Sequence, residues 1–110
     1  MEKKVLTLRI SKKWFYKIAN REKKEEYREI KEYWCKRLTT NCECHYDVAN
    51  EYYCGKVLFK PYTHVLFING YSKYSPKMEW KIKEICIDYP KKGLCPDEWL
   101  NTMFFTIKFE

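Results

Sequence analysis

The chain has 110 residues, of which 34% are charged and 18% aromatic, and it carries a formal net charge of +7. That length suits one domain and excludes a second hydrophobic core of ordinary size, so we expect a single domain over residues 1–110. No run approaches the ~20 apolar residues of a membrane-spanning helix, and the first residues lack the apolar stretch of a signal peptide, so we expect a cytoplasmic protein without a membrane partner.

The positive charge is unevenly distributed along the chain. Residues 1–37 contain 13 Lys or Arg against 6 Asp or Glu, whereas residues 38–110 contain 9 of each. A basic surface near the N-terminus attracts phosphate groups and raises the rate of encounter with polyanions. RNA or a nucleotide is therefore the predicted partner, and a basic face that serves only solubility is the alternative.

The first third of the chain predicts a strand and two helices. Residues 5–10 alternate with the period of two that marks a strand with one buried face. Ser11 can cap a helix through its hydroxyl, and apolar residues at helical spacing predict that helix over residues 12–19. The run 21–31 is almost entirely charged and has no apolar stripe, so composition alone leaves helix or strand open. A short helix is expected over residues 32–38.

The remainder of the chain predicts mostly strands. Residues 39–56 are irregular and are interpreted as an inserted loop. β-Branched and aromatic runs follow, with a turn at Asn69-Gly70. In residues 77–88 the apolar positions change parity between residues 82 and 85, which a β-bulge explains. The absence of repeated parallel βαβ units favours an α+β barrel over a doubly wound sheet. Strands are expected over residues 57–59, 63–68, 77–88 and 103–109, and a short helix over residues 96–100.

Several motifs occur together in an order that resembles the ASCH domains, a group within the PUA-like superfamily. The charged run resembles the family's G-x-K-x-x-E-x-R motif, with Lys23, Glu26 and Arg28 in its positions. The preceding helix, the Asn-Gly-Tyr-Ser turn and the final Phe-x-Ile-Lys strand resemble short phage and bacterial members. The resemblance implies a PUA-like mixed β-barrel with short flanking helices and a cleft, and it makes residues 23–31 a barrel strand.

One position departs from the family motif. Arg21 stands where the family has its leading glycine. A turn that requires a positive φ must then be made by Asn20, which tolerates that conformation better than most residues, or it must relax.

The motif supplies a candidate binding site for a nucleic acid or nucleotide. On a strand, Glu26 and Arg28 point to the same face, where the guanidinium could pair with the carboxylate or bind a phosphate. Lys23 lies near the start of that strand. The alternative interpretation is a structural ion pair at the barrel mouth. The candidate ligand-binding residues are Lys13, Trp14, Lys23, Glu26, Arg28, Asn69, Tyr71, Ser72 and Lys73.

Aromatic side chains add to this interpretation, because exposed rings beside Lys or Arg stack nucleic-acid bases. The rings near basic residues are those of Trp14, Tyr27, Tyr33, Trp34, Tyr71 and Tyr74. The turn that carries Tyr71, Ser72 and Lys73 could close over a ligand, or it could be an ordinary hairpin turn. Four other side chains are expected in the core: Phe15, Ile18, Trp80 and Phe105.

Two other functions stay open. Some small bacterial members of the group resemble amidohydrolases of N4-acylated cytidines, and Lys23 matches their lysine. Glu26 stands where their threonine nucleophile would be, which puts hydrolysis in doubt. An enzyme could still use Lys23 as a general base while Glu26 orients water, on a nucleoside or on an RNA bond. The other alternative is a phage-type interaction protein that binds a host protein or a signalling nucleotide.

The cysteines do not predict a metal or cofactor. One group lies in the inserted loop and lacks the C-x₂₋₄-C spacing usual for zinc, so reduced thiols are expected there: Cys42, Cys44, His45 and Cys54. Small apolar fillers are expected at Cys35, Cys86 and Cys95. His45 and His64 alone do not make a catalytic pair.

Overall fold

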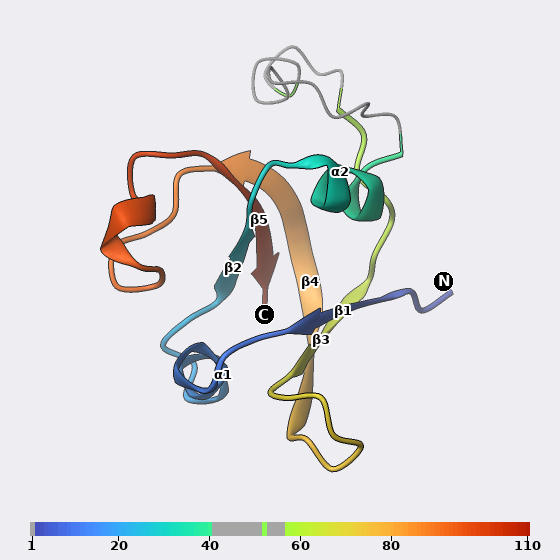
Figure 1. The fold of residues 1–110 in the computed structure, drawn as a ribbon. Coiled ribbons are helices and arrows are strands. Elements are labelled where there is room, and N and C mark those ends of the chain that lie inside the picture. The colour runs from blue at the N-terminus through green and yellow to red at the C-terminus, as the bar shows by residue number, and fades with distance from the viewer. Residues whose placement is uncertain (1, 41–51, 53–56) are drawn as a thin grey trace. The chain divides into compact units, whose positions relative to one another are not determined.

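A computed structural model describes residues 2–40, 52 and 57–110 (Figure 1). The described strands form one mixed sheet in the order β1-β3-β4-β5-β2, so the fold class is α+β, as predicted. Most of the predicted loop over residues 39–56 lies outside the described residues. The elements in chain order are β1 (Val5–Arg9), α1 (Lys12–Ala19), β2 (Glu25–Arg28), α2 (Glu32–Leu38), β3 (His64–Ile68), β4 (Lys77–Asp88), the 3-10 helix η1 (Asp97–Trp99) and β5 (Phe104–Phe109).

The sheet is open, and the closed barrel that we expected is not formed by the described strands. The strand order ends at β1 on one side and at β2 on the other. Closing a sheet into a barrel requires its two terminal strands to pair, and β2, with 4 residues, offers few backbone groups for such a ladder. The strand expected at residues 57–59 is also reduced to a single bridge between Phe59 and Thr39.

By its internal contacts the chain divides into two compact units, which we describe separately. Unit 1 comprises Met1–Glu26, Pro61–Glu84 and Ile107–Glu110, and unit 2 comprises Tyr27–Lys60 and Ile85–Thr106. Strands β2, β4 and β5 each contribute residues to both units. In the part of the chain that the structure describes, no helix is both long and apolar enough to cross a membrane.

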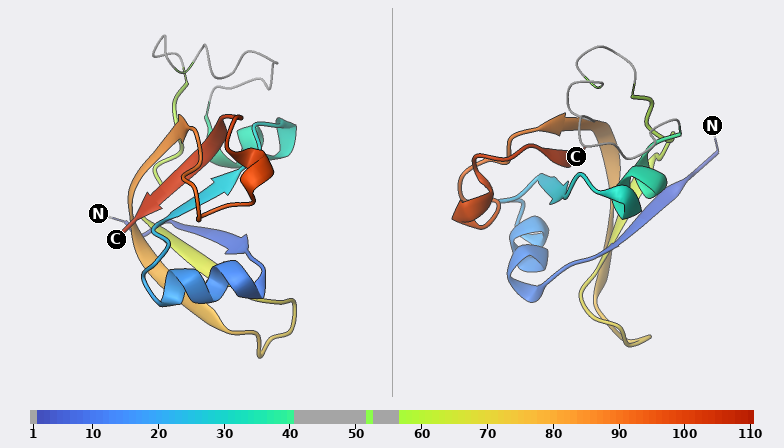
Figure 2. Two further views of the ribbon diagram at one scale, coloured as in Figure 1. Left: turned by 90° about the vertical axis from the view of Figure 1, so that its left-hand side faces the viewer. Right: turned by 45° about the horizontal axis from the view of Figure 1, so that its top comes forward.

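Unit 1 is built on the pairing of β1 with β3. These strands run parallel and side by side, and β4 continues the sheet antiparallel to β3 (Figure 2). Their alternating apolar residues are buried because one face of each strand is turned inward. Helix α1 adds Phe15 and Ile18, which are three residues apart and therefore share a helical face. The ring of Phe67 packs against that of Phe109 with centroids 5.1 Å apart.

Unit 2 has its own small core. Helix α2 buries Cys35 and Leu38, again at a spacing of three. Tyr27 is 2% exposed and packs with Cys95 and Phe104, and its hydroxyl accepts a hydrogen bond from the backbone N–H of residue 91 at 3.2 Å. Cys35, Cys86 and Cys95 are buried thiols, which confirms their predicted role as fillers.

Burial along the strands confirms one prediction and corrects two. Lys83 and Glu84 are exposed in succession, so the inward face of β4 changes phase where the sequence predicts it. Trp80, expected in the core, is only half-buried. Tyr27, expected among the rings available for base stacking, is buried. Hydrophobicity alone does not decide whether Trp80 and Tyr27 are buried, because a ring with one polar atom is stable both in a core and at a surface.

Candidate functional site

Helix α1 places one indole ring within reach of several cations. Trp14 is half-buried, and the ammonium groups of Lys13, Lys17 and Lys23 lie 4.6, 5.6 and 4.8 Å from its ring centroid. Lys17 reaches the ring because it follows Trp14 by three residues on the helix. The negative face of the indole attracts each ammonium group, which offsets part of the repulsion among the three charges. We call these four residues the Trp14 cluster.

Lys23 is the buried member of the Trp14 cluster. Its side chain is 1% exposed, and its Nζ lies 3.3 Å from Oε1 of Glu26, which is itself 7% exposed. A charge removed from water is costly unless it is paired, so the ion pair makes this burial tolerable. The contact between Lys23 and Glu26 agrees with the structural ion pair that the sequence left open, and it also brings two chemically active groups together.

The turn after α1 brings Lys23 back to the helix. The backbone N–H groups of Glu22 and Lys23 both donate to the carbonyl oxygen of Lys17, at 2.9 and 3.1 Å. The left-handed residue in this turn is Arg21, with φ of +65°, whereas Asn20 has φ of −80°. The expectation that Asn20 would supply the positive φ is therefore wrong.

Arg21 is held in its unusual backbone conformation by a side-chain contact. The guanidinium carbon lies 3.9 Å from the ring centroid of Trp80 on β4. Stacking at this distance combines cation–π attraction with burial of the ring face. The guanidinium covers part of the Trp80 ring, which is half-buried.

A pocket lies where β1 runs into α1. It has a volume of about 320 Å³ and is lined by Arg9, Ser11, Asn69 and Tyr71 together with Ile10 and Gly70. The Asn69 amide donates to the carbonyl oxygen of Ile10 at 2.9 Å, which joins the turn to the end of β1. The guanidinium of Arg9 lies 4.8 Å from the ring centroid of Tyr71 and donates to the Gly70 carbonyl oxygen. We call this space the Arg9 pocket.

The Arg9 pocket reaches the N-cap residue of helix α1, and three residues of the Trp14 cluster lie on that helix. Ser11 is the N-cap residue and makes no side-chain capping bond, so its hydroxyl does not occupy the backbone N–H groups of the first turn. Trp14 follows it by three residues, in the first turn of α1.

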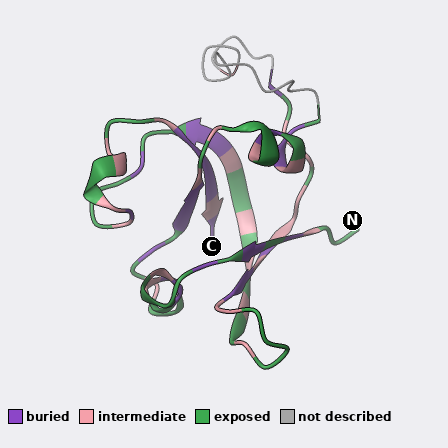
Figure 3. Ribbon diagram, viewed as in Figure 1, coloured by how far each residue is buried: buried purple, intermediate pink, exposed green. Residues whose placement is uncertain are grey.

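The turn between β3 and β4 is exposed over most of its length (Figure 3). Tyr71 is 87% exposed and Tyr74 is 83% exposed. Ser72 holds the loop, since its Oγ accepts the N–H of Tyr74 at 3.1 Å and its N–H donates to the Oγ of Ser75 at 3.0 Å. Lys73 lies over Tyr74 at 5.0 Å. Ser72 is thus engaged in the turn itself, which favours the hairpin interpretation for that residue.

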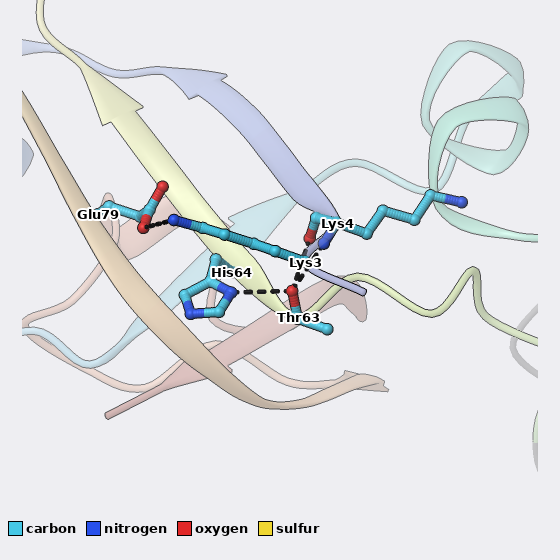
Figure 4. Close-up of polar contacts among 5 residues, drawn as sticks. All are labelled: Lys3, Lys4, Thr63, His64 and Glu79. Carbon is cyan, nitrogen blue, oxygen red and sulfur yellow. Dashed lines mark hydrogen bonds and ion pairs between the residues drawn. The ribbon is translucent and has the colours of Figure 1, made fainter. Parts of the chain in front are cut away.

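Unit 1 contains a second group of polar side chains, and their contacts with one another are structural (Figure 4). The Oγ1 of Thr63 accepts the backbone N–H of Lys4 at 2.8 Å and contacts Nδ1 of His64 at 2.8 Å, while Lys3 pairs with Glu79 at 2.7 Å. The backbone N–H of Thr63 donates to the Lys4 carbonyl oxygen at 2.8 Å. These contacts join the start of β1 to the start of β3, and the hydroxyl of Thr63 is engaged in them.

The structure brings together some of the predicted site residues. Lys13, Trp14, Lys23 and Glu26 form one group, and Asn69 and Tyr71 line the Arg9 pocket. Arg28 belongs to unit 2, where its guanidinium lies 5.0 Å from the ring of Trp34. Three residues of these groups were not predicted from the sequence: Arg9, Ser11 and Lys17. The spacing of three residues between Trp14 and Lys17 could have indicated Lys17. Arg9 and Ser11 become pocket residues only because the turn at residues 69–71, distant in the sequence, lies against them.

The described residues do not form a metal site. Among residues 2–40, 52 and 57–110, no group of three His, Cys, Asp or Glu side chains could hold a metal ion. The Cys42, Cys44, His45 and Cys54 group lies outside them. A scan against protein-family models, a search of curated proteins and a search of solved structures each returned no match to the chain.

Proposed function

We propose that unit 1 binds RNA or a nucleotide through the Trp14 cluster and the Arg9 pocket. The observation that carries the proposal is the gathering of three ammonium groups around one half-buried indole, with the Glu26 carboxylate beside one of them. Concentrated positive charge favours a polyanion, and the charge of a phosphate is the natural complement.

The Arg9 pocket supplies the second element of recognition. Its volume of about 320 Å³ falls at the lower end of the range of small-ligand sites. A phosphate near Arg9 would also meet the first-turn N–H groups of α1, whose helix dipole favours a negative charge. The exposed ring of Tyr71 offers a face or edge to a base. Arg9 and the helix N-terminus would thus bind the phosphate, and Tyr71 would contact the base.

Membership of the ASCH group and its PUA-like fold are part of this proposal. The left-handed conformation of Arg21 supports it, because that residue stands where the family motif has glycine. The proximity of Lys23 and Glu26 supports it as well, since both occupy motif positions. The proposal then requires that a PUA-like fold tolerates an open sheet.

Hydrolysis is a second candidate, favoured by one contact. Lys23 and Glu26 lie 3.3 Å apart, so the candidate general base lies beside the carboxylate that would orient the water. The burial of Lys23, which is 1% exposed, weighs against direct attack on a substrate. Binding is therefore the first proposal, and turnover of an N4-acylcytidine, lost in Lys23→Arg with folding retained, would shift the balance to an enzyme, because arginine keeps the buried charge but cannot act as a base.

The binding proposal is tested with a Lys13→Ala/Lys17→Ala variant and short oligonucleotides. Lys13 is exposed, and neither position belongs to the buried ion pair. The expected result is at least about tenfold weaker binding of a single-stranded 12-mer at low salt, with a salt slope reduced by about 1.4, or about 0.7 for each lost charge. Fluorescence anisotropy at several salt concentrations measures both quantities.

The matched control is Lys81→Ala/Lys83→Ala, which removes two exposed charges from β4 in the same unit. If both double variants bind equally, the Trp14 cluster is not the site. If neither RNA, DNA nor any mononucleotide binds the unaltered protein, the proposal is wrong.

A further inference from the structure

Helix α2 of unit 2 (Figure 1) carries two aromatic residues and an arginine, and the last residue of β2 adds a second arginine near them. The guanidinium carbons of Arg28 and Arg37 lie 5.0 and 5.1 Å from the ring centroid of Trp34. Arg37 also lies 5.7 Å from the ring of Tyr33, whose ring meets that of Trp34 edge to face at 4.8 Å. We call these four residues the Trp34 cluster.

The Trp34 cluster lies away from the buried face of the helix. That face consists of Cys35 and Leu38, whereas Tyr33 is 57% exposed and Trp34 and Arg37 are half-buried. Tyr33 and Arg37 are four residues apart and so meet on the outer surface of α2. The core of unit 2 therefore does not account for the gathering of two guanidiniums and two rings.

The remaining charges on α2 are paired with each other. Lys36 lies 2.9 Å from Glu32, and the hydrogen bond from Lys36, together with its charge, lowers the pKa of the Glu32 carboxyl. The carboxylate that α2 contributes is thus engaged by Lys36, one turn along the helix. The Trp34 cluster holds two guanidinium groups near a single ring, and an anion that bridges them would be attracted by both.

The chemistry of a stacked guanidinium indicates which anion fits. The N–H donors of a guanidinium lie in one plane, and Arg37 directs one of its five donors, on Nη1, to the Tyr33 hydroxyl at 3.5 Å. Donors fixed in this way match the oxygens of a phosphate, where two parallel hydrogen bonds can form. An exposed tyrosine ring beside them can stack an unpaired base, which a duplex does not offer.

We propose that the Trp34 cluster is a second nucleic-acid contact, which binds the phosphodiester backbone of a single strand through Arg28 and Arg37 and stacks a base on Tyr33. The inference rests on the proposed function for the class of ligand and deepens it. The Trp34 cluster then adds affinity for a strand and none for a single nucleotide.

The test compares a mononucleotide with a single-stranded 12-mer, prepared both as RNA and as DNA. Arg37→Ala should weaken binding of the 12-mer about fivefold or more and reduce the salt slope by about 0.7. Tyr33→Leu should also weaken it about fivefold or more, with an unchanged salt slope, because it removes stacking and no charge. Neither variant should change the affinity for the mononucleotide, and an effect on RNA alone would assign a contact to the 2′-hydroxyl.

Two controls define the outcome. Lys92→Ala removes an exposed charge from unit 2 outside α2 and should leave both affinities unchanged, and circular dichroism should show that each variant is folded. If the unaltered protein binds the 12-mer and all variants bind it equally, the Trp34 cluster is not a contact, and the proposed function stands. If the unaltered protein binds no nucleic acid, the proposed function fails and this inference fails with it.

Discussion

Replacing Lys23 with methionine should destabilise the protein by about 3–5 kcal/mol, because it removes one charge of a buried ion pair. Lys23 is 1% exposed, Glu26 is 7% exposed, and the charged atoms lie 3.3 Å apart. At an effective dielectric constant of about 20, two unit charges at that distance attract each other by about 5 kcal/mol. The variant loses this attraction but retains the cost of keeping the Glu26 carboxylate away from water.

The double variant Lys23→Met/Glu26→Leu should recover most of that loss. Two apolar side chains of similar volume carry no desolvation cost, and such replacements of buried pairs are often neutral or stabilising. Urea denaturation followed by circular dichroism measures the free energy of unfolding of both single variants and of the double variant. In a thermal scan, a loss of 3 kcal/mol would lower the midpoint by about 12 °C or more.

The neighbouring Lys24→Met is the matched control, since Lys24 is exposed and the substitution is the same. Its effect should stay within about 0.5 kcal/mol. The reasoning is refuted if each single variant loses less than about 1 kcal/mol and the two effects add in the double variant, because interdependent buried charges cannot behave additively.

Two further predictions concern backbone positions with positive φ. Arg21→Gly should be more stable than Arg21→Ala by about 1 kcal/mol in chemical denaturation. Both variants lose the contact with Trp80, but only alanine keeps the strain at φ of +65°. Equal stability of the two variants would show that this conformation is not strained. Gly70→Ala should cost about 1–3 kcal/mol, since φ is +120° and the added Cβ would lie 2.6 Å from the Oγ of Ser75. Gly93→Ala, which has φ of +86° and no atom within 4 Å of the added Cβ, should cost less, and the reverse order would exclude the steric explanation.

The helices could be predicted from the sequence with the bounds that the structure has. Lys12–Ala19 and Glu32–Leu38 each place two apolar residues three apart toward a core, and this periodicity is a local property of the chain. The fold class could be predicted for the same reason, since alternation and turn residues mark most strands. The open sheet could not, because strand order depends on pairings between distant segments.

The candidate site was predictable only in part. The charged run gives no periodic signal, because the burial of Lys23 and Glu26 depends on their ion pair and not on hydrophobicity. Arg9 becomes a pocket residue through the turn that carries Gly70 and Tyr71, and Gly70 lies 61 positions from Arg9, so no local pattern marks that contact. The conformation of Arg21 was unexpected because the energetic cost of a left-handed arginine is offset by a ring on another strand.

The parallel pairing of β1 with β3 has a consequence for how the chain folds. Val5 lies opposite His64, and the bonds between Lys4 and Thr63 span 59 positions of the sequence. At a synthesis rate of about 5–20 residues per second, the N-terminal segment waits roughly 3–12 seconds on the ribosome before its partner strand exists. Its inward side chains, Leu6 and Leu8, have no native strand to pack against during that interval. Unit 1 therefore has high contact order, and its folding is expected to be slow and to follow the completion of β3.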